Sequence, residues 1–196
     1  MKRSSQAMLL RHELNLCLVL LCGFILLLAA SSARAQDAVS REYQIKAAYL
    51  YNFAKFVDWP QESFTDGQSP LVIGVFGQNP FGTGLEAIAK AHQINGRPIV
   101  VKTITTAKDI AGVHLLFLGS AEDDHVAEIL SALAGTSVLT VGESDKFMAA
   151  GGMVNFVREA DKVRFAINED AVEHHGMKIS AQLLKLATFV RKSTLQ

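Results

Sequence analysis

The spacing of hydrophobic residues between Ser40 and Val57 predicts an amphipathic helix. Ser40 suits the N-cap position. The helix should end at Asp58-Trp59-Pro60, because the residue before a proline is forced out of the helical region. The apolar face is expected to carry Ile45, Tyr49, Asn52, Phe53 and Phe56, and the polar side Arg41, Glu42, Lys46 and Lys55.

Further along the chain, short apolar runs alternate with helical patterns. Asn95-Gly96 adds a turn signal. Continuous apolar strands that alternate with helices are typical of a largely parallel sheet covered on both faces. Strands are predicted over Leu71 to Phe76, Pro98 to Thr105, Val113 to Leu118 and Ser137 to Val141, and helices over Gly82 to His92 and Glu122 to Leu133.

The last third of the chain has a different pattern. Met153 to Arg158 and Lys162 to Asn168 are apolar runs so close together that they should form an antiparallel hairpin. A short helix from Glu169 to His175 should follow, with a break at Gly176. A second helix is predicted from an apolar stripe of Ile179, Leu183, Leu186, Ala187 and Val190. The sequence thus predicts one α/β domain, with a mixed, mostly parallel sheet flanked by helices and a C-terminal hairpin and helix.

Residues 1–35 have the pattern of a secretory signal peptide, which leaves 36–196 as the mature domain. Lys2, Arg3 and Arg11 give the positive start, an apolar run of fifteen residues follows, and Ala33 and Ala35 suit signal peptidase. The alternative is an uncleaved membrane anchor. A span needs about 20 apolar residues, so the short run favours cleavage after Ala35 and a soluble mature chain.

Both cysteines, Cys17 and Cys22, lie in the predicted signal peptide, so the mature chain has no disulfide although it enters an oxidising compartment. A lipid anchor on Cys22 is not expected, because Leu21 before it is too bulky. Cleavage removes four of the 19 basic and one of the 19 acidic residues, which leaves a formal charge of −3. That charge gives no basic surface for nucleic acid or anionic lipid.

Four glycines between residues 74 and 84 cross a strand-to-helix turn, where phosphate-binding loops occur. Their spacing matches neither the dinucleotide motif nor the P-loop motif, and Pro80 and Phe81 interrupt the loop. We therefore expect these glycines to serve the turn itself.

The other candidates for chemistry are equally weak. The side chains of His174 and His175 would diverge by about 100° on a helix, so they cannot chelate one ion together. Asp123, Asp124 and His125 open a predicted helix, where carboxylates balance the helix dipole. No motif for a serine nucleophile is present, and a cysteine nucleophile is absent from the mature chain. The sequence predicts no metal, no cofactor and no enzymatic activity, although carboxylates that only the fold brings together stay open.

The stretch from Tyr49 to Pro60 holds five aromatic residues in twelve positions, more than one apolar stripe requires. In one interpretation, Phe53, Phe56 and Trp59 are core residues. In the other, the stretch is an edge for a partner protein or a second subunit, where Tyr and Trp are enriched. The second interpretation predicts a partner-binding surface of Tyr51, Asn52, Lys55 and Trp59.

Three parts of the chain share motifs with a known family. Residues 45–60 read IKAAYLYNFAKFVDWP, residues 74–82 read GVFGQNPFG, and residues 95–98 read NGRP. Near the end, GMVNF at 152–156, FAIN at 165–168, KIS at 178–180 and LLKLA at 183–187 follow in order. Together these motifs resemble the YfiR-like family of periplasmic proteins over nearly the whole mature chain.

The resemblance implies a periplasmic α/β domain that forms a homodimer. It also implies that the domain inhibits a membrane-bound diguanylate cyclase through that enzyme's periplasmic sensor region, and thereby lowers cyclic-di-GMP signalling. The partner is then an inner-membrane sensor protein. The best-known members carry cysteine pairs that respond to redox state, and the mature chain here has none, so the resemblance does not carry redox control over.

A second hypothesis is a periplasmic domain that senses a small ligand and reports to another membrane receptor. Open α/β sheets bind ligands at the carboxyl ends of their strands. The ligand-binding residues would then be Gly77, Asn79, Phe81 and Gly82.

Overall fold

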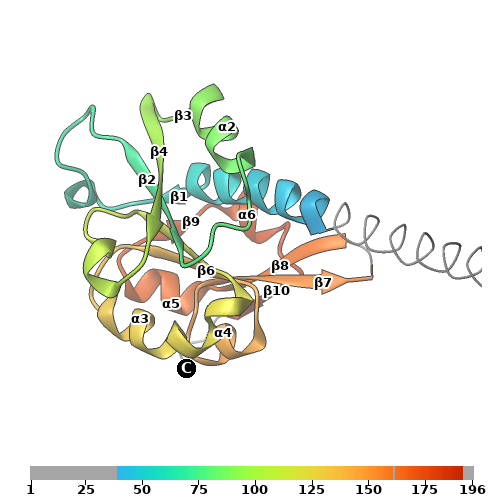
Figure 1. Ribbon diagram of the computed structural model, residues 1–196. Coiled ribbons are helices and arrows are strands. Elements are labelled where there is room, and N and C mark those ends of the chain that lie inside the picture. The colour runs from blue at the N-terminus through green and yellow to red at the C-terminus, as the bar shows by residue number, and fades with distance from the viewer. Residues whose placement is uncertain (1–38, 161, 192–196) are drawn as a thin grey trace, which may run out of the picture. The chain divides into compact units, whose positions relative to one another are not determined.

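The computed structural model describes residues 39–160 and 162–191. The chain divides into two compact units, one up to Arg41 and one of Glu42–Gln196. The predicted signal peptide and its cleavage site lie outside the described residues, so they stay predictions. The α/β fold is that of the second unit, Glu42–Gln196 (Figure 1).

A mixed eight-stranded sheet of order β10-β8-β7-β6-β5-β2-β4-β3 forms the centre of this unit. Strands β4, β2, β5, β6 and β7 run parallel, β8 is antiparallel to β7, and β10 is parallel to β8. This arrangement confirms the predicted fold class, including the hairpin. The strands are β2 (Leu71–Phe76), β3 (Gln93–Ile94), β4 (Arg97–Ile104), β5 (Leu115–Leu118), β6 (Leu139–Gly142), β7 (Val154–Glu159), β8 (Lys162–Asn168) and β10 (Phe189–Arg191).

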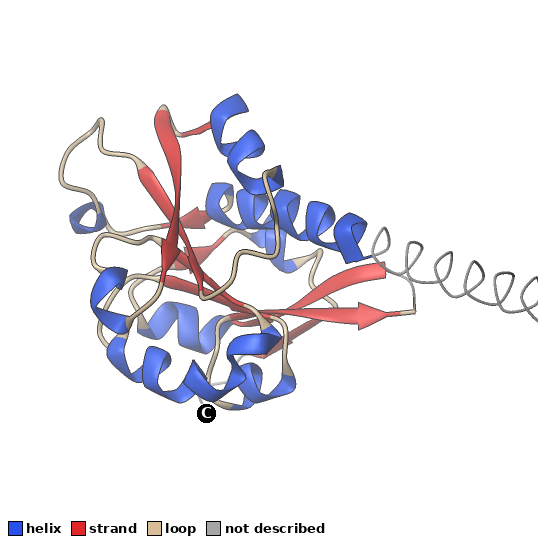
Figure 2. Cartoon of the chain, viewed as in Figure 1, coloured by secondary structure: helices blue, strands red, loops and turns tan. Residues whose placement is uncertain are grey.

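Helices cover both faces of the sheet (Figure 2). The helix that ends at residue 55 and α2 pack on one core cluster, which contains Phe53, Leu85 and Phe117; α3 and α4 pack on the other, which contains Val126 and Phe147. All six residues of β2 are buried, as expected for a strand between two covered faces. The helical elements are η1 (Gln61–Ser63), α2 (Gly84–Ala91), η2 (Ala107–Ile110), η3 (Ser120–His125), α3 (Val126–Ala132), α4 (Asp145–Ala149), α5 (Glu169–His174) and α6 (Ala181–Leu184).

The first helix exists as predicted, but two of its residues lie on the opposite sides from those expected. Ile45, expected on the apolar face, is 43% exposed, whereas Lys46, expected on the polar side, is only 6% exposed. The buried face of the helix is instead formed by Lys46, Ala47, Leu50, Phe53 and Ala54. The prediction was wrong because Lys46 has a buried acidic partner that a hydrophobic pattern cannot reveal.

The predicted last helix is also wrong beyond its first turn. Ser180 caps α6, its Oγ accepting from the backbone N–H of Leu183, but α6 is only four residues long. The chain then turns back to the sheet, where the N–H of Thr188 donates to the carbonyl of Phe165 and β10 pairs with β8. Leu186, predicted to be buried, is 58% exposed.

A second, small sheet joins distant parts of the chain. Strand β1 (Val57–Asp58), directly after the first helix, pairs antiparallel with β9 (Lys178–Ile179). The N–H of Ser180 extends the ladder by donating to the carbonyl of Phe56 at 2.9 Å. The sequence pattern did not predict this pairing, because both strands are only two residues long.

Helix α4, which the sequence did not predict, carries a buried aromatic ring into a site without room for other side chains. The ring of Phe147 packs against Gly142 and Gly152. A Cβ on Gly142 would lie 2.3 Å from this ring, and a Cβ on Gly152 would lie 2.1 Å from it. Neither glycine has a positive φ, so space and not backbone conformation requires glycine at both positions.

We expect Gly152→Ala to lower the free energy of unfolding by about 1–3 kcal/mol, because its methyl group would displace the Phe147 ring in a packed core. Urea denaturation followed by circular dichroism measures the change. Gly84→Ala, in α2, is the matched control: its Cβ meets nothing within 4 Å, so stability should stay the same or rise slightly. Equal midpoints for Gly152→Ala and the natural chain would contradict this account.

Candidate functional site

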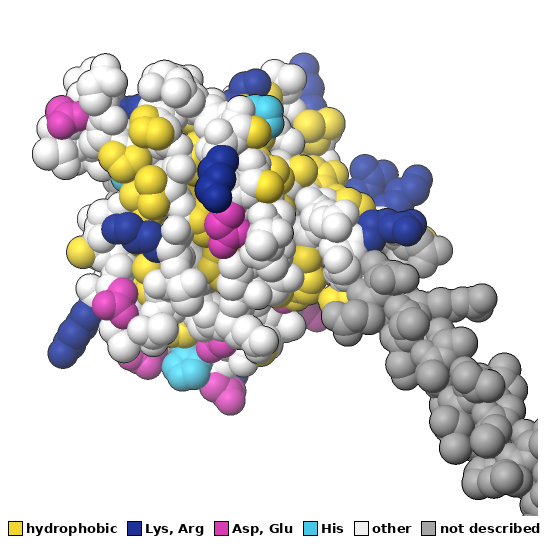
Figure 3. Space-filling view, turned by 45° about the horizontal axis from the view of Figure 1, so that its top comes forward, with side chains coloured by type: hydrophobic (Ala, Val, Ile, Leu, Met, Phe, Trp, Pro, Cys, Tyr) yellow, Lys and Arg dark blue, Asp and Glu magenta, His cyan; other side chains and the backbone are white. Residues whose placement is uncertain are grey.

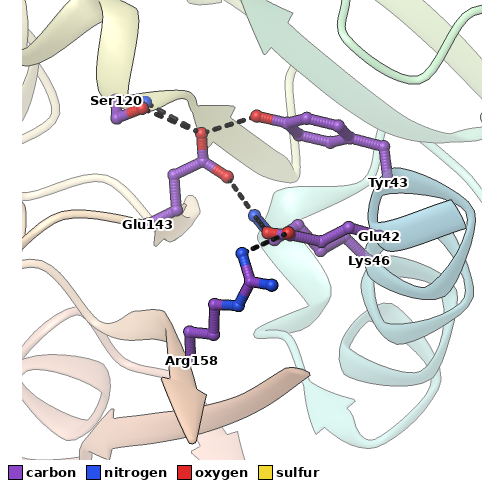
Figure 4. A network of polar contacts seen from close by, with 6 residues as sticks. All are labelled: Glu42, Tyr43, Lys46, Ser120, Glu143 and Arg158. Carbon is purple, nitrogen blue, oxygen red and sulfur yellow. Dashed lines mark hydrogen bonds and ion pairs between the residues drawn. The ribbon is translucent and has the colours of Figure 1, made fainter. Parts of the chain in front are cut away.

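The carboxyl ends of β5 and β6 meet a polar cluster contributed by the first helix (Figure 4). Glu143 follows β6, and Ser120 begins η3 just after β5. Tyr43 and Lys46 extend from the helix toward the Glu143 carboxylate. Ligands of open α/β sheets bind at this end of the strands, so the cluster occupies the place where a ligand would be expected.

The Glu143 carboxylate is fully engaged by donors of the protein. Its Oε2 lies 2.6 Å from Lys46 Nζ, and its Oε1 accepts from the Tyr43 hydroxyl and from the Ser120 N–H, both at 2.9 Å. The side chains of Glu143 and Lys46 are only 6% and 7% exposed. A buried ion pair requires this degree of hydrogen bonding, because both charges have lost their water.

A second carboxylate links the pair to the surface. Lys46 Nζ also lies 2.6 Å from Glu42 Oε1, one helical turn earlier, and Glu42 Oε2 lies 3.7 Å from Arg158 Nη1 on β7. The Lys46 ammonium further sits 4.6 Å from the centre of the Tyr43 ring. Alternating charges therefore run from the buried end of the sheet out to Arg158.

These contacts keep the Tyr43 phenol protonated. Burial raises the pKa of Tyr43 far above its ordinary value of 10.0, and the Glu143 charge, the hydrogen bond to Glu143 and the Glu42 charge raise it further. The hollow beside Lys46 and Glu143 has a volume of about 70 Å³, well below the range of ligand pockets. We conclude that the cluster fastens the first helix to the sheet.

The four predicted ligand residues lie in the loop after β2, and two of their side chains are used within the protein. Phe81 is buried, its ring centre 4.9 Å from that of Phe117 and 5.5 Å from that of Tyr43. Asn79 Oδ1 accepts from the Phe81 N–H, and its Nδ2 donates to Glu86. Gly77 and Gly82 both have positive φ, as the turn requires. Ligand binding by this loop stays a prediction.

The predicted partner residues divide between an exposed helix end and a groove. Lys55 is exposed, and Tyr51 and Asn52 are half-buried, with the Tyr51 ring 5.0 Å from that of His92. Trp59 lies beyond the helix, half-buried, against the ring of His114. Three of the four predicted residues thus lie at the end of one helix. Trp59 follows them in the sequence and lies in the wall of a groove.

The groove beside Trp59 has a volume of about 520 Å³, and sequence analysis did not find it. Arg97 shapes one wall: its guanidinium lies 3.9 Å above the Phe64 ring and donates to the carbonyls of Asp66 and Ser69. The sequence feature that could have indicated the groove is the NGRP motif at 95–98. Its Asn95-Gly96 turn places Arg97 at the start of β4, next to the segment that holds Phe64 and Asp66. The lining residues are Trp59, Gln61, Phe64, Asp66, Gly67, Asn95 and Arg97.

The histidines and acids considered for metal binding have other contacts. His175 Nδ1 lies 2.8 Å from the carbonyl of Ala171, and Asp123 accepts from Ser144 Oγ at 2.6 Å. Asp124 pairs with Lys146. Among residues 39–160 and 162–191, no group of three or more His, Cys, Asp or Glu side chains could hold a metal ion.

We expect Glu143→Ala to lower the free energy of unfolding by about 3 kcal/mol, because the buried Lys46 would keep only the more exposed Glu42 as its ionic partner and the Tyr43 hydroxyl would lose its acceptor. Urea denaturation at pH 7 measures the loss. Asp124→Ala is the matched control, since it breaks the exposed ion pair with Lys146 and should leave the midpoint unchanged. If both variants unfolded at the same urea concentration, the cluster would not fasten the helix.

The chain resembles known proteins at two levels. The YfiR/HmsC-like family model matches residues 43–188. Among solved structures, the chain is similar to a conserved domain protein from Vibrio cholerae O1 biovar El Tor, with 15% identity, a TM-score of 0.46, and coverage of 61% of this chain and 54% of that one.

It is also similar to the ABC domain in complex with L-Trp from Streptococcus pneumonia, with 13% identity, a TM-score of 0.46, and coverage of 62% and 55%. The chain thus spans about half the length of both structures. No helix in the described ranges has the length and apolar character needed to cross a membrane. The match over residues 43–188, which contain the whole central sheet up to β8 and the helices around it, places this chain in the YfiR/HmsC-like family.

Proposed function

We propose that this protein is a periplasmic regulator that binds the periplasmic region of an inner-membrane diguanylate cyclase and holds the enzyme in its inactive state, which lowers cyclic-di-GMP signalling. The observation that carries the proposal is the family match over residues 43–188. The signal-peptide pattern of residues 1–35 supports export to the periplasm. The fully bonded Glu143 cluster is consistent with binding as the activity, because it leaves that site no free group for chemistry.

A binding protein can inhibit an enzyme only if it prefers one of the enzyme's states. The proposed contact surface is Tyr51, Asn52, Lys55 and Trp59. Lys55 and Tyr51 offer a charge and an amphipathic ring, and Trp59 offers the wall of the groove. Figure 3 shows hydrophobic side chains gathered over the upper half of the face with β4 and α2, with lysine or arginine side chains among them. A non-obligate protein interface has about the same mixture of apolar and charged surface as the rest of a protein, so this face is compatible with such a contact.

Homodimer formation is part of the proposal, as the family resemblance implies. A disulfide does not contribute to it, because Cys17 and Cys22 both precede the proposed cleavage site. The signal that releases the partner must then be something other than thiol oxidation within this chain.

Affinity capture tests the proposal. Residues 36–196 carrying a C-terminal tag, incubated with detergent-solubilised membranes of the source bacterium, should recover a diguanylate cyclase, and adding the protein to that cyclase should lower the rate of cyclic-di-GMP formation. Recovery of porins and chaperones alone would contradict the proposal.

A charge reversal locates the contact. We expect Lys55→Glu to weaken capture of the cyclase about tenfold, equivalent to about 1.4 kcal/mol, without changing the unfolding midpoint, because Lys55 is exposed. Lys108→Glu, which reverses an exposed lysine in η2, is the control and should bind normally. Equal capture by both variants would remove Lys55 from the contact surface.

A second candidate function is the sensing of a small ligand, and the groove beside Trp59 favours it. Its volume of about 520 Å³ lies within the usual range of ligand pockets, and it combines aromatic faces with a cation. A thermal-shift screen against periplasmic metabolites tests this function, since a ligand at 100 times its dissociation constant should add about 2.7 kcal/mol to stability. A screen without any shift would contradict it.

A further inference from the structure

His114 connects the sheet to the segment that forms the groove. It lies just before β5 and is 6% exposed. Its backbone is fixed within the sheet, because its N–H donates to the carbonyl of Val72 and its carbonyl accepts from Leu139. The His114 side chain extends from this fixed point to Ser63 of η1.

Both ring nitrogens of His114 are bonded to backbone groups. Nδ1 lies 3.1 Å from the N–H of Val72, and Nε2 lies 3.0 Å from the carbonyl of Ser63. A backbone N–H can only donate and a carbonyl can only accept, so Nδ1 must carry the lone pair and Nε2 the hydrogen. The structure therefore requires one tautomer of the neutral imidazole.

The same ring supports the aromatic wall of the groove. Phe64 stacks on it with ring centres 4.5 Å apart, and Trp59 meets it edge to face at 6.4 Å. Arg97 covers the other face of Phe64. Trp59 Nε1 and Ser63 Oγ are buried without a hydrogen-bond partner within the described part of the chain, so neither side chain fastens this segment by a polar contact. His114 and Arg97 therefore supply its side-chain hydrogen bonds to the sheet.

The positive charge of Arg97 disfavours a proton on the His114 ring. Arg97 of β4 is positive, and β2 presents only the Val72 N–H. Glu62 of η1 lines the hollow next to His114 together with Ser137, while Asp58 and Asp66 line the grooves at Arg97. Backbone groups occupy both ring nitrogens, which leaves neither of them for a carboxylate.

Burial lowers the pKa of His114 below its ordinary value of 6.5, the hydrogen bond to the Ser63 carbonyl raises it in part, and Arg97 lowers it again. Because the folded pKa is lowered, the unfolded chain binds this proton more readily. The stabilisation by neutral His114 is therefore complete above about pH 6.5 and is lost as pH falls through the folded pKa.

We propose that His114 is a proton-binding switch: a proton on Nδ1 puts a second donor against the Val72 N–H, so the ring moves away from β2, carries with it the segment around Trp59, Ser63 and Phe64 that contacts it, and opens the wall of the groove. Arg97 remains bonded to Asp66 and Ser69, so the segment shifts without unfolding the sheet. Acid would then change the surface that contains Trp59. That consequence for partner binding rests on the proposed function, whereas the switch itself rests on the geometry of His114.

Trp59 is the single tryptophan of the chain and lies against His114, so its fluorescence reports the switch directly. On titration from pH 8 to pH 4.5, Trp59 emission should change reversibly with a midpoint below about pH 6.5, while far-UV circular dichroism stays constant. One pH unit below the midpoint, about nine in ten molecules should have changed.

His114→Asn keeps an acceptor at the Nδ1 position without titrating, so its emission should not change with pH. His92→Gln, which removes the ring beside Tyr51, is the control and should keep the transition. If His114→Asn fails to fold, the NMR shift of the His114 ring protons in the natural chain must show the same midpoint as Trp59. Emission that is independent of pH in the natural chain, or the same transition in folded His114→Asn, would overturn the switch.

Capture of the cyclase at pH 7.5 and at one unit below the midpoint separates the two proposals. We expect the natural chain to lose about tenfold in capture at the lower pH and His114→Asn to lose none. A fluorescence transition with no cyclase captured at either pH would support the switch and overturn the proposed function. If capture fell equally for the natural chain and for His114→Asn at the lower pH, the His114 switch would not control partner binding.

Discussion

The buried ion pair between Lys46 and Glu143 holds the first helix on the sheet, and much of the structure depends on that attachment. Glu143 comes from the carboxyl end of β6, and the Ser120 N–H and the Tyr43 hydroxyl complete its shell of donors. The helix then covers the rings of Phe156 and Phe165 with Phe53 and Tyr49. In many α/β proteins the same end of the sheet receives a ligand, whereas here the protein's own lysine and tyrosine occupy it.

The attachment also fixes the segment directly after the helix. Residue 55 ends the helix, β1 pairs with β9, and Trp59 then lies against His114, where the groove begins. The exposed helix end and the groove are thus held in one orientation by contacts at opposite ends of a short stretch of chain. A surface held in this way loses little conformational entropy when it binds a partner.

The sequence predicted those features that depend on local periodicity. The buried run of β2, the hairpin of β7 and β8, and the helix α2 all formed as expected. The burial of Lys46 was not predicted, because it depends on Glu143, which lies 97 residues further along the chain. The end of the chain was missed because the pattern at Leu183 and Leu186 fits a helix, while pairing with β8 draws the chain into a strand. The groove was invisible because Phe64 and Arg97 meet only through the fold.

The pairing of β1 with β9 brings together the early and late parts of the domain, and the Tyr43 hydroxyl finds its acceptor 100 positions further along. Contacts of such large sequence separation form slowly, because loop closure must precede any gain from them. A ribosome would therefore release most of this chain before its first helix could find its place. The proposed export would therefore meet a chain whose first helix is not yet docked on the sheet.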